Sequence, residues 1–459
     1  MSANNTVIQK SRYTEGSIGL HVLQLSSVMI FGFLAMTLGS LIELYYIGQI
    51  GTSALAAVAF MFPLTMALNA FTRGIGIGAS TLIAQAMGQS DQQRTSEIVT
   101  HCYLLVTTLT VLMAFALSVL SESVLATLGA SGEVLNLSTQ YSRIWLLGFP
   151  AMGLAMVSNG LIRAYGNPTF PGYIMTIAPV IQVLVGPVLI FGWLGIAPMG
   201  LNGAGWAFVI GGLAQLALAA YWYLFKARLV YNSLKHFSTN CRQILKVGLP
   251  AAATNLIQPV SLGLVTYLLA GFGDEVIAGF GIATRIESVV GMVVIGISTS
   301  VVPLVGQNWS AGLVDRVNYS LRICYIGCLA WGATAAVIMW FGADFFVSAI
   351  NEDAAVMTVA IAFLHIVPLS IGFMGMMTVA THGFNALRRP IPALWLSIAR
   401  LILVYLPLAL IGRALFGYIG VFWATAIANL VLGIISAAWL HRLIATLTSR
   451  PDSTTAYRP

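Results

Sequence analysis

The chain has 459 residues, of which 58% are hydrophobic and 8% are charged, and its formal net charge is +7. A soluble protein carries about 25% charged residues, because they cover its water-facing surface. This composition therefore excludes a soluble enzyme, a nucleic-acid-binding protein and a disordered chain, and it indicates a protein of the lipid bilayer.

Apolar stretches long enough to cross a membrane recur along the whole chain. A membrane-spanning helix needs about 20 predominantly apolar residues. The stretches are interrupted by glycine and proline but lack strand-like alternation, which argues against an outer-membrane barrel. We predict an all-α membrane protein with twelve transmembrane helices, near residues 18–47, 54–87, 97–120, 140–165, 172–191, 204–225, 245–272, 276–307, 317–341, 354–386, 393–411 and 421–446.

The positions of lysine and arginine predict the orientation of these spans. The first 16 residues are polar and lack the charge and apolar order of a cleaved signal peptide. With the N-terminus placed inside, 16 of the 21 basic residues fall on the inner side, and only Arg143 and Arg413 fall on the outer side. Basic loops stay in the cytoplasm as a rule. We therefore expect a multi-pass protein with both termini cytoplasmic.

The two halves of the chain resemble each other. The pattern at 87–89 recurs at 305–307 with an offset of 218 residues, and Gly51 recurs as Gly273 with an offset of 222. Matches in the same order at a nearly constant offset indicate an internal duplication. Six spans in each half is an even number, so we expect two lobes related by a pseudo-two-fold axis along the membrane normal.

The longest polar break of the chain sets the predicted domain boundaries. It carries four basic residues between Lys226 and Arg242. We predict an N-terminal six-helix lobe at 1–225, a basic cytoplasmic linker at 226–244, a C-terminal six-helix lobe at 245–446 and a cytoplasmic tail at 447–459.

Three segments carry the motifs of a known family. Residues 47–51 (Ile-Gly-Gln-Ile-Gly) look like the end of its first helix, 163–168 (Arg-Ala-Tyr-Gly-Asn-Pro) resemble its fourth helix, and 303–308 (Pro-Leu-Val-Gly-Gln-Asn) resemble its eighth. With these motifs the chain resembles MATE (multidrug and toxic compound extrusion) transporters of the MOP flippase superfamily. The resemblance covers nearly the whole chain and implies two lobes around a central cavity. It also implies a bacterial inner-membrane antiporter that exports amphipathic, often cationic, drugs or toxins by alternating access, and we expect a monomer.

Glu43 is the leading candidate for cation coupling. Ionisable residues inside a span are functional by default, since an ionised carboxylate there costs about 2.5–3.5 kcal/mol. This cost favours the protonated form, as a proton carrier requires. The resemblance implies the same role, because the family has an acidic residue at this place. The alternatives are a carboxylate that reaches the outer surface and one paired with an arginine. We expect H⁺ as the coupling ion, with Na⁺ as the alternative, and no other cofactor and no metal site.

The second acid inside a span is Glu287, a further candidate for cation or proton coupling. It follows Arg285 at a spacing that does not share a helix face, so the two side chains need not pair. The remaining candidates are expected to line the substrate cavity, through amide groups, a cation, and ring or thioether surfaces. They are Tyr46, Gln182, Asn255, Gln258, Arg285 and Met292. Gln182 and Gln258 stand where the family pattern has polar or acidic residues on helices five and seven.

Other features narrow the function further. The chain lacks a Walker loop, a His-Glu-x-x-His motif and a Gly-x-Ser-x-Gly elbow. We therefore expect no enzymatic activity, and transport driven by an ion gradient.

Gly74, Gly76 and Gly78 lie within a span and indicate close helix packing. The alternative function is a flippase or exporter of lipid-linked or anionic cargo, which Arg73, Arg285 and Arg400 leave open.

Overall fold

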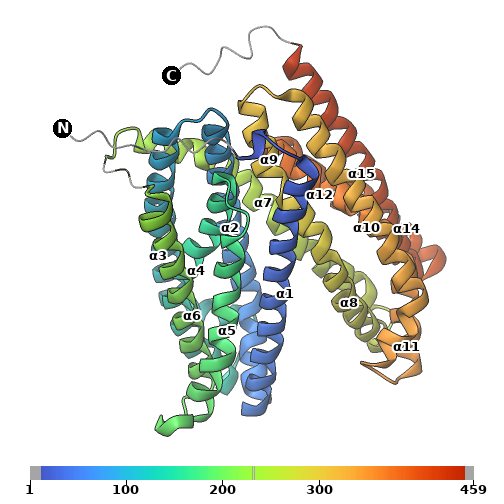
Figure 1. Ribbon diagram of the computed structural model, residues 1–459. Coiled ribbons are helices and arrows are strands. Elements are labelled where there is room, and N and C mark those ends of the chain that lie inside the picture. The colour runs from blue at the N-terminus through green and yellow to red at the C-terminus, as the bar shows by residue number, and fades with distance from the viewer. Residues whose placement is uncertain (1–11, 230, 232, 450–459) are drawn as a thin grey trace. The chain divides into compact units, whose positions relative to one another are not determined.

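The computed structural model describes residues 12–229, 231 and 233–449, and these residues are helical nearly throughout (Figure 1). Lys10, Arg450 and Arg458, which enter the predicted orientation, lie outside the described residues, as do both ends of the chain.

Twelve helical segments in the described part of the chain are long and apolar enough to cross a membrane. This confirms the predicted all-α membrane class and the number of spans. They are α1 (Ile18–Ile50), α2 (Thr52–Gly88), α3 (Gln92–Thr127), α4 (Gly132–Tyr165), α5 (Phe170–Phe191), α6 (Leu201–Tyr221) with η3 (Trp222–Ala227), α7 (Phe237–Ala270), α8 (Asp274–Thr299) with α9 (Val301–Ser310), α10 (Val314–Ser348), α11 (Ala354–Ile366) with η4 (Val367–Ser370) and α12 (Ile371–Ala386), α13 (Pro390–Ile398) with η5 (Ala399–Tyr405) and α14 (Leu406–Phe416), and α15 (Tyr418–Thr448).

Contacts divide the chain into two compact units. Unit 1 contains residues 31–87 and 91–252, and unit 2 contains residues 12–30, 88–90 and 253–449 among those described. The polar segment after η3 and the first half of α7 therefore pack within unit 1. A packing unit is not the same as a sequence repeat, so the lobe limits at 225 and 245 stay a prediction.

Two helices pass from one unit to the other. Helix α1 leaves unit 2 after Ile30, and α7 leaves unit 1 after Ala252, which is 222 residues later. This is the offset that relates Gly51 to Gly273 in the sequence. Each half of the chain thus begins with a helix whose first part packs in the other unit, as a duplicated fold would produce.

The glycines of α2 allow close contact with two neighbouring helices of unit 1. A Cβ atom on Gly78 would collide with the carbonyl oxygen of Ile244 in α7, and one on Gly74 would collide with the backbone of Ala252. A Cβ atom on Gly76 would lie 3.4 Å from a methyl group of Val157 in α4. Small residues bring membrane helices together by this means, so the predicted packing role of these glycines is confirmed.

Candidate coupling and substrate sites

Helix α1 packs against α5 along a stripe with a step of seven residues. A Cβ atom on Gly32 would lie 2.9 Å from the sulfur of Met175, and one on Gly39 would lie 2.6 Å from the Cβ atom of Pro179. One step further, the ring of Tyr46 lies above Gly186, 3.8 Å from where its Cβ atom would be. Seven residues are close to two helical turns, so these contacts mark one continuous face of α1.

Glu43 and Gln182 lie on the two faces that meet in this stripe. Glu43 follows Gly39 by four residues and precedes Tyr46 by three, which is the spacing of neighbours on one helix face. Gln182 follows Pro179 by three residues and precedes Gly186 by four, so it occupies the matching place on α5. Both side chains are partly buried. By this spacing, Glu43 and Gln182 belong to the stretches of α1 and α5 that pack together within unit 1.

Two aromatic contacts occur in this part of unit 1. The phenol of Tyr141, buried in α4, interacts electrostatically with the Glu43 carboxylate. The ring of Tyr46 meets Phe191 edge to face, with 6.2 Å between ring centroids. Within the described residues, no hydrogen bond or ion pair reaches the Glu43 carboxylate. Pairing with an arginine, one alternative for this residue, is therefore not found there.

A second group of polar side chains lies inside unit 2. Glu287 of α8 interacts electrostatically with Arg400, which lies in the π-helical segment η5. Arg400 donates from Nη1 to Oδ1 of Asn429 at 3.1 Å, and Asn429 donates from Nδ2 to Oγ of Ser370 at 3.0 Å. Ser370 ends the 3₁₀ turn η4, and both Asn429 and Ser370 are buried. These hydrogen bonds therefore link α15 to two spans that are interrupted by non-α-helical turns, at η4 and at η5.

Sequence reasoning missed Asn429 and Ser370. The signal that could have found Asn429 is an amide in the otherwise apolar run 426–432, because a polar group at that depth needs a partner. Ser370 gives no such signal, since a serine in a membrane helix commonly bonds to its own backbone.

The other predicted cavity residues have different surroundings. Arg285 and Gln258 are exposed, Asn255 is partly buried, and Met292 is buried. Arg285 and Glu287 differ in exposure, in agreement with the expectation that they do not share a face. Tyr46 and Gln182 belong to unit 1, whereas these four residues belong to unit 2. Their joint lining of one cavity stays a prediction.

The described residues offer no ready metal centre. No group of three or more histidine, cysteine, aspartate or glutamate side chains is gathered closely enough to hold a metal ion in that part of the chain. The four cysteines are free and buried. What the two polar groups can do is gain and lose protons and bind polar or charged ligands.

Known proteins resemble this chain over most of its length. The MatE family model matches residues 29–188 and 250–411. The chain is 30% identical to the FAD transporter of Shewanella oneidensis over 421 residues, 91% of the chain and 93% of that protein. It is 24% identical to the multidrug export protein MepA of Staphylococcus haemolyticus over 441 residues, 95% and 96% of the two chains. Its fold is similar to the MATE transporter VcmN of Vibrio cholerae, with a TM-score of 0.87, 24% identity, and coverage of 94% and 97%.

Proposed function

The chain belongs to the MatE family of membrane transporters, and from this we propose that it exports amphipathic, often cationic, organic compounds in exchange for protons. The transporter is a monomer in the inner membrane of a bacterium, with both termini in the cytoplasm, and it catalyses no covalent chemistry. Relatives named as multidrug export proteins support this substrate class.

The observation that carries the proposal is the position of Glu43. Glu43 lies on α1 between Gly39 and Tyr46, which pack against α5, and its charge acts on the phenol of Tyr141. A partly buried carboxylate without a counter-charge is expensive to keep ionised in a membrane. Binding of either a proton or a cationic ligand to the Glu43 carboxylate is therefore favourable. When both ligands compete for one group, each lowers the affinity for the other, and this is coupling in the thermodynamic sense.

The surroundings of Glu43 favour H⁺ over Na⁺ as the coupling ion. Hard cations are held by several oxygen ligands. Glu43 is the only acid in α1, and α5 offers Gln182 and Gly186 on the stretch that packs against it but no acid. A proton needs only the carboxylate. Glu287 in unit 2 is proposed as a second proton site, with Arg400 as the nearby cation that it neutralises when it is ionised.

Reconstituted vesicles test this function. The protein is inserted into liposomes, a proton gradient or a sodium gradient is imposed separately, and the movement of ethidium is followed by fluorescence. We expect transport with the proton gradient alone, and its loss in Glu43→Gln. Glu122→Gln, which changes an exposed acid of α3, serves as the matched control. Transport by Glu43→Gln that still responds to the proton gradient would exclude Glu43 from coupling.

A second candidate function is export of an anionic cargo with aromatic groups. The relative at 30% identity is named an FAD transporter, and Arg73 and Arg285 are exposed on their helices. An arginine can bind phosphate groups through two parallel hydrogen bonds. Vesicles loaded with FAD distinguish the two functions. A rate of flavin release that is lower in Arg285→Gln than in the unchanged protein, and that added ethidium does not change, would support the anionic cargo instead.

A further inference from the structure

The part of the chain that joins the sixth span to the seventh carries an excess of positive charge. It runs from η3 through residues 228–236 into the first turns of α7. The sequence has no aspartate or glutamate between Glu133 and Asp274. Five cations of this part are exposed, and none of them forms an ion pair within the described residues. We call these five the basic patch: Lys226, Arg228, Lys235, Arg242 and Lys246.

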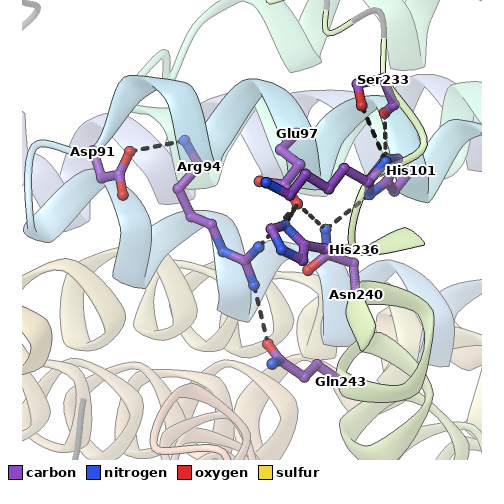
Figure 2. A network of polar contacts seen from close by, with 9 residues as sticks. Asp91, Arg94, Glu97, His101, Ser233, His236, Asn240 and Gln243 are labelled. Atoms are coloured by element: carbon purple, nitrogen blue, oxygen red, sulfur yellow. Dashed lines mark hydrogen bonds and ion pairs between the residues drawn. The ribbon is translucent and has the colours of Figure 1, made fainter. Parts of the chain in front are cut away.

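Hydrogen bonds hold this part of the chain on the start of α3 (Figure 2). Nδ2 of Asn240, in the first turn of α7, donates to Oε1 of the buried Glu97 at 2.9 Å. Nε2 of His101 donates to the carbonyl oxygen of Ser233 at 2.9 Å. The connection between the two spans is therefore fastened to unit 1, and it presents its outer side chains in a fixed arrangement.

The backbone turns the cations of the basic patch away from α3. Arg228 ends η3 with a φ of 51°, and the next residue, Leu229, is buried in a cluster with apolar residues of α3. In α7, Arg242 and Lys246 are four residues apart and are therefore neighbours on one helix face. Ile244, between them, is buried in the same cluster as Leu229. One face thus packs within unit 1, and the other carries the charge.

The acids at the start of α3 are engaged by other groups. Asp91 caps α3, since its carboxylate accepts from the backbone N–H of Arg94 at 2.8 Å. Glu97 is 6% exposed and accepts from Nη1 of Arg94 at 3.2 Å as well as from Asn240. Figure 2 shows both carboxylates directed at these partners. The basic patch therefore keeps its charge for a ligand outside the chain.

Large apolar side chains stand next to these cations. Phe225 is 67% exposed directly before Lys226, and Leu234 is 67% exposed directly before Lys235. The ring of Tyr221 lies 5.6 Å from that of Phe225. Exposed apolar side chains among cations are typical of segments that lie in a membrane interface, with the apolar groups at the acyl boundary. A nucleic acid would use the cations but leave Leu234 in water, so the combination favours a lipid surface.

We propose that the basic patch binds the headgroups of anionic phospholipids, with Phe225 and Leu234 inserted at the acyl boundary. The basic patch adjoins the ends of two spans, so the headgroups of one leaflet lie at its level. Lysine and arginine bind phosphate oxygens by charge-assisted hydrogen bonds, and basic residues next to a span attract anionic lipids. The orientation predicted from the basic residues makes this the cytoplasmic leaflet. A lipid bound there joins the end of the sixth span to the beginning of α7.

Native mass spectrometry of the full-length protein in a neutral detergent tests the proposal. The protein is titrated with phosphatidylglycerol or with phosphatidylcholine, and the apparent dissociation constant of the first bound lipid is measured. We expect tighter binding of phosphatidylglycerol. The double variant Arg242→Gln/Lys246→Gln should weaken it by about five- to 25-fold, because each cation close to an anionic lipid surface contributes a factor of about five. Its affinity for phosphatidylcholine should not change.

Two control variants make the result specific. Arg322→Gln/Arg442→Gln removes two exposed cations of unit 2, so its net charge is the same, and it should bind phosphatidylglycerol like the unchanged protein. Arg242→Lys/Lys246→Arg keeps both charges of the basic patch and should also bind normally. Equal melting temperatures of all variants without added lipid show that each of them folds.

Four outcomes would overturn the proposal. They are equal affinity for the two lipids, equal weakening by the two charge-removing variants, displacement of phosphatidylglycerol by inorganic phosphate at the same concentration, and tighter binding of a short oligonucleotide than of phosphatidylglycerol. The third would assign the basic patch to free phosphate and the fourth to nucleic acid. The measurement needs no transport, so its outcome is separate from that of the proposed function.

Discussion

Gly39 of α1 and Pro179 of α5 are so close that a Cβ atom on the glycine would lie 2.6 Å from that of the proline. Glu43 lies one helical turn further along α1, and Gln182 lies one turn further along α5. The candidate coupling site therefore depends on the absence of a side chain at position 39.

Gly39→Ala is expected to push α1 away from α5. Because a rigid proline ring cannot move aside, overpacking of this kind costs about 1–3 kcal/mol, and we expect a lower melting temperature together with weaker proton-driven transport. Gly48→Ala is the matched control on the same helix, since its Cβ atom would meet only Leu55, at 3.7 Å. Thermal unfolding in detergent and the vesicle assay measure both effects. Equal behaviour of the two variants would refute the dependence on this contact.

Gly78→Ala should separate α2 from α7. Its Cβ atom would collide with the carbonyl oxygen of Ile244, which belongs to a helix backbone and cannot turn away. We expect a loss of about 1–3 kcal/mol of stability, measured as the shift in thermal unfolding. Gly263→Ala in α7 has open space around the new methyl group. It should leave stability unchanged or raise it, because alanine is the better helix former by about 1 kcal/mol.

Asn429→Leu should destabilise unit 2 through Arg400. The variant removes the acceptor of the guanidinium and the donor to Ser370, and an unsatisfied buried polar group costs about 1–3 kcal/mol, more when it is charged. Ser436→Ala, also in α15, removes only a bond to the carbonyl of Gly433 on its own helix and should have a small effect. If both variants shifted the melting temperature by the same amount, the hydrogen bonds from Arg400 through Asn429 to Ser370 would not contribute to the stability of unit 2.

Arg316→Lys should release the segment that precedes α1. Arg316 donates to the carbonyl oxygens of Tyr13, Glu15 and Gly16 and to Oδ1 of Asn308. A lysine has one nitrogen and cannot hold this set. Faster cleavage by trypsin after Arg12 is the expected readout. Arg322→Lys, which changes an exposed position on the same helix, serves as the control and should be cleaved at the rate of the unchanged protein. Equal cleavage rates for the unchanged protein and both variants would count against this role of Arg316.

Much of the fold could be predicted from the sequence. The span expected at 18–47 is α1 (Ile18–Ile50), and the one expected at 354–386 ends at the same residue as α12. Hydropathy predicts spans well because the lipid acts on each stretch of about 20 residues separately, so the information is local. The internal duplication is predicted for a similar reason, since short patterns recur along the sequence at a nearly constant offset.

The candidate sites were only partly readable. Glu43 and Glu287 stand out because a charge inside a span is costly wherever it packs. The sequence does not say what lies beside them, and the neighbours Tyr141 and Arg400 come from residues more than 90 positions away.

What the sequence by itself determined is therefore the helices, their number and the two acids inside spans. Only the tertiary structure decided that α1 and α7 change units in mid-helix, that Asn429 joins Arg400 to Ser370, and that Glu97 meets His236 and Asn240 across some 140 residues. Such contacts depend on which helix faces meet in space, and side chains that meet at a distance in the chain leave no periodic pattern along it.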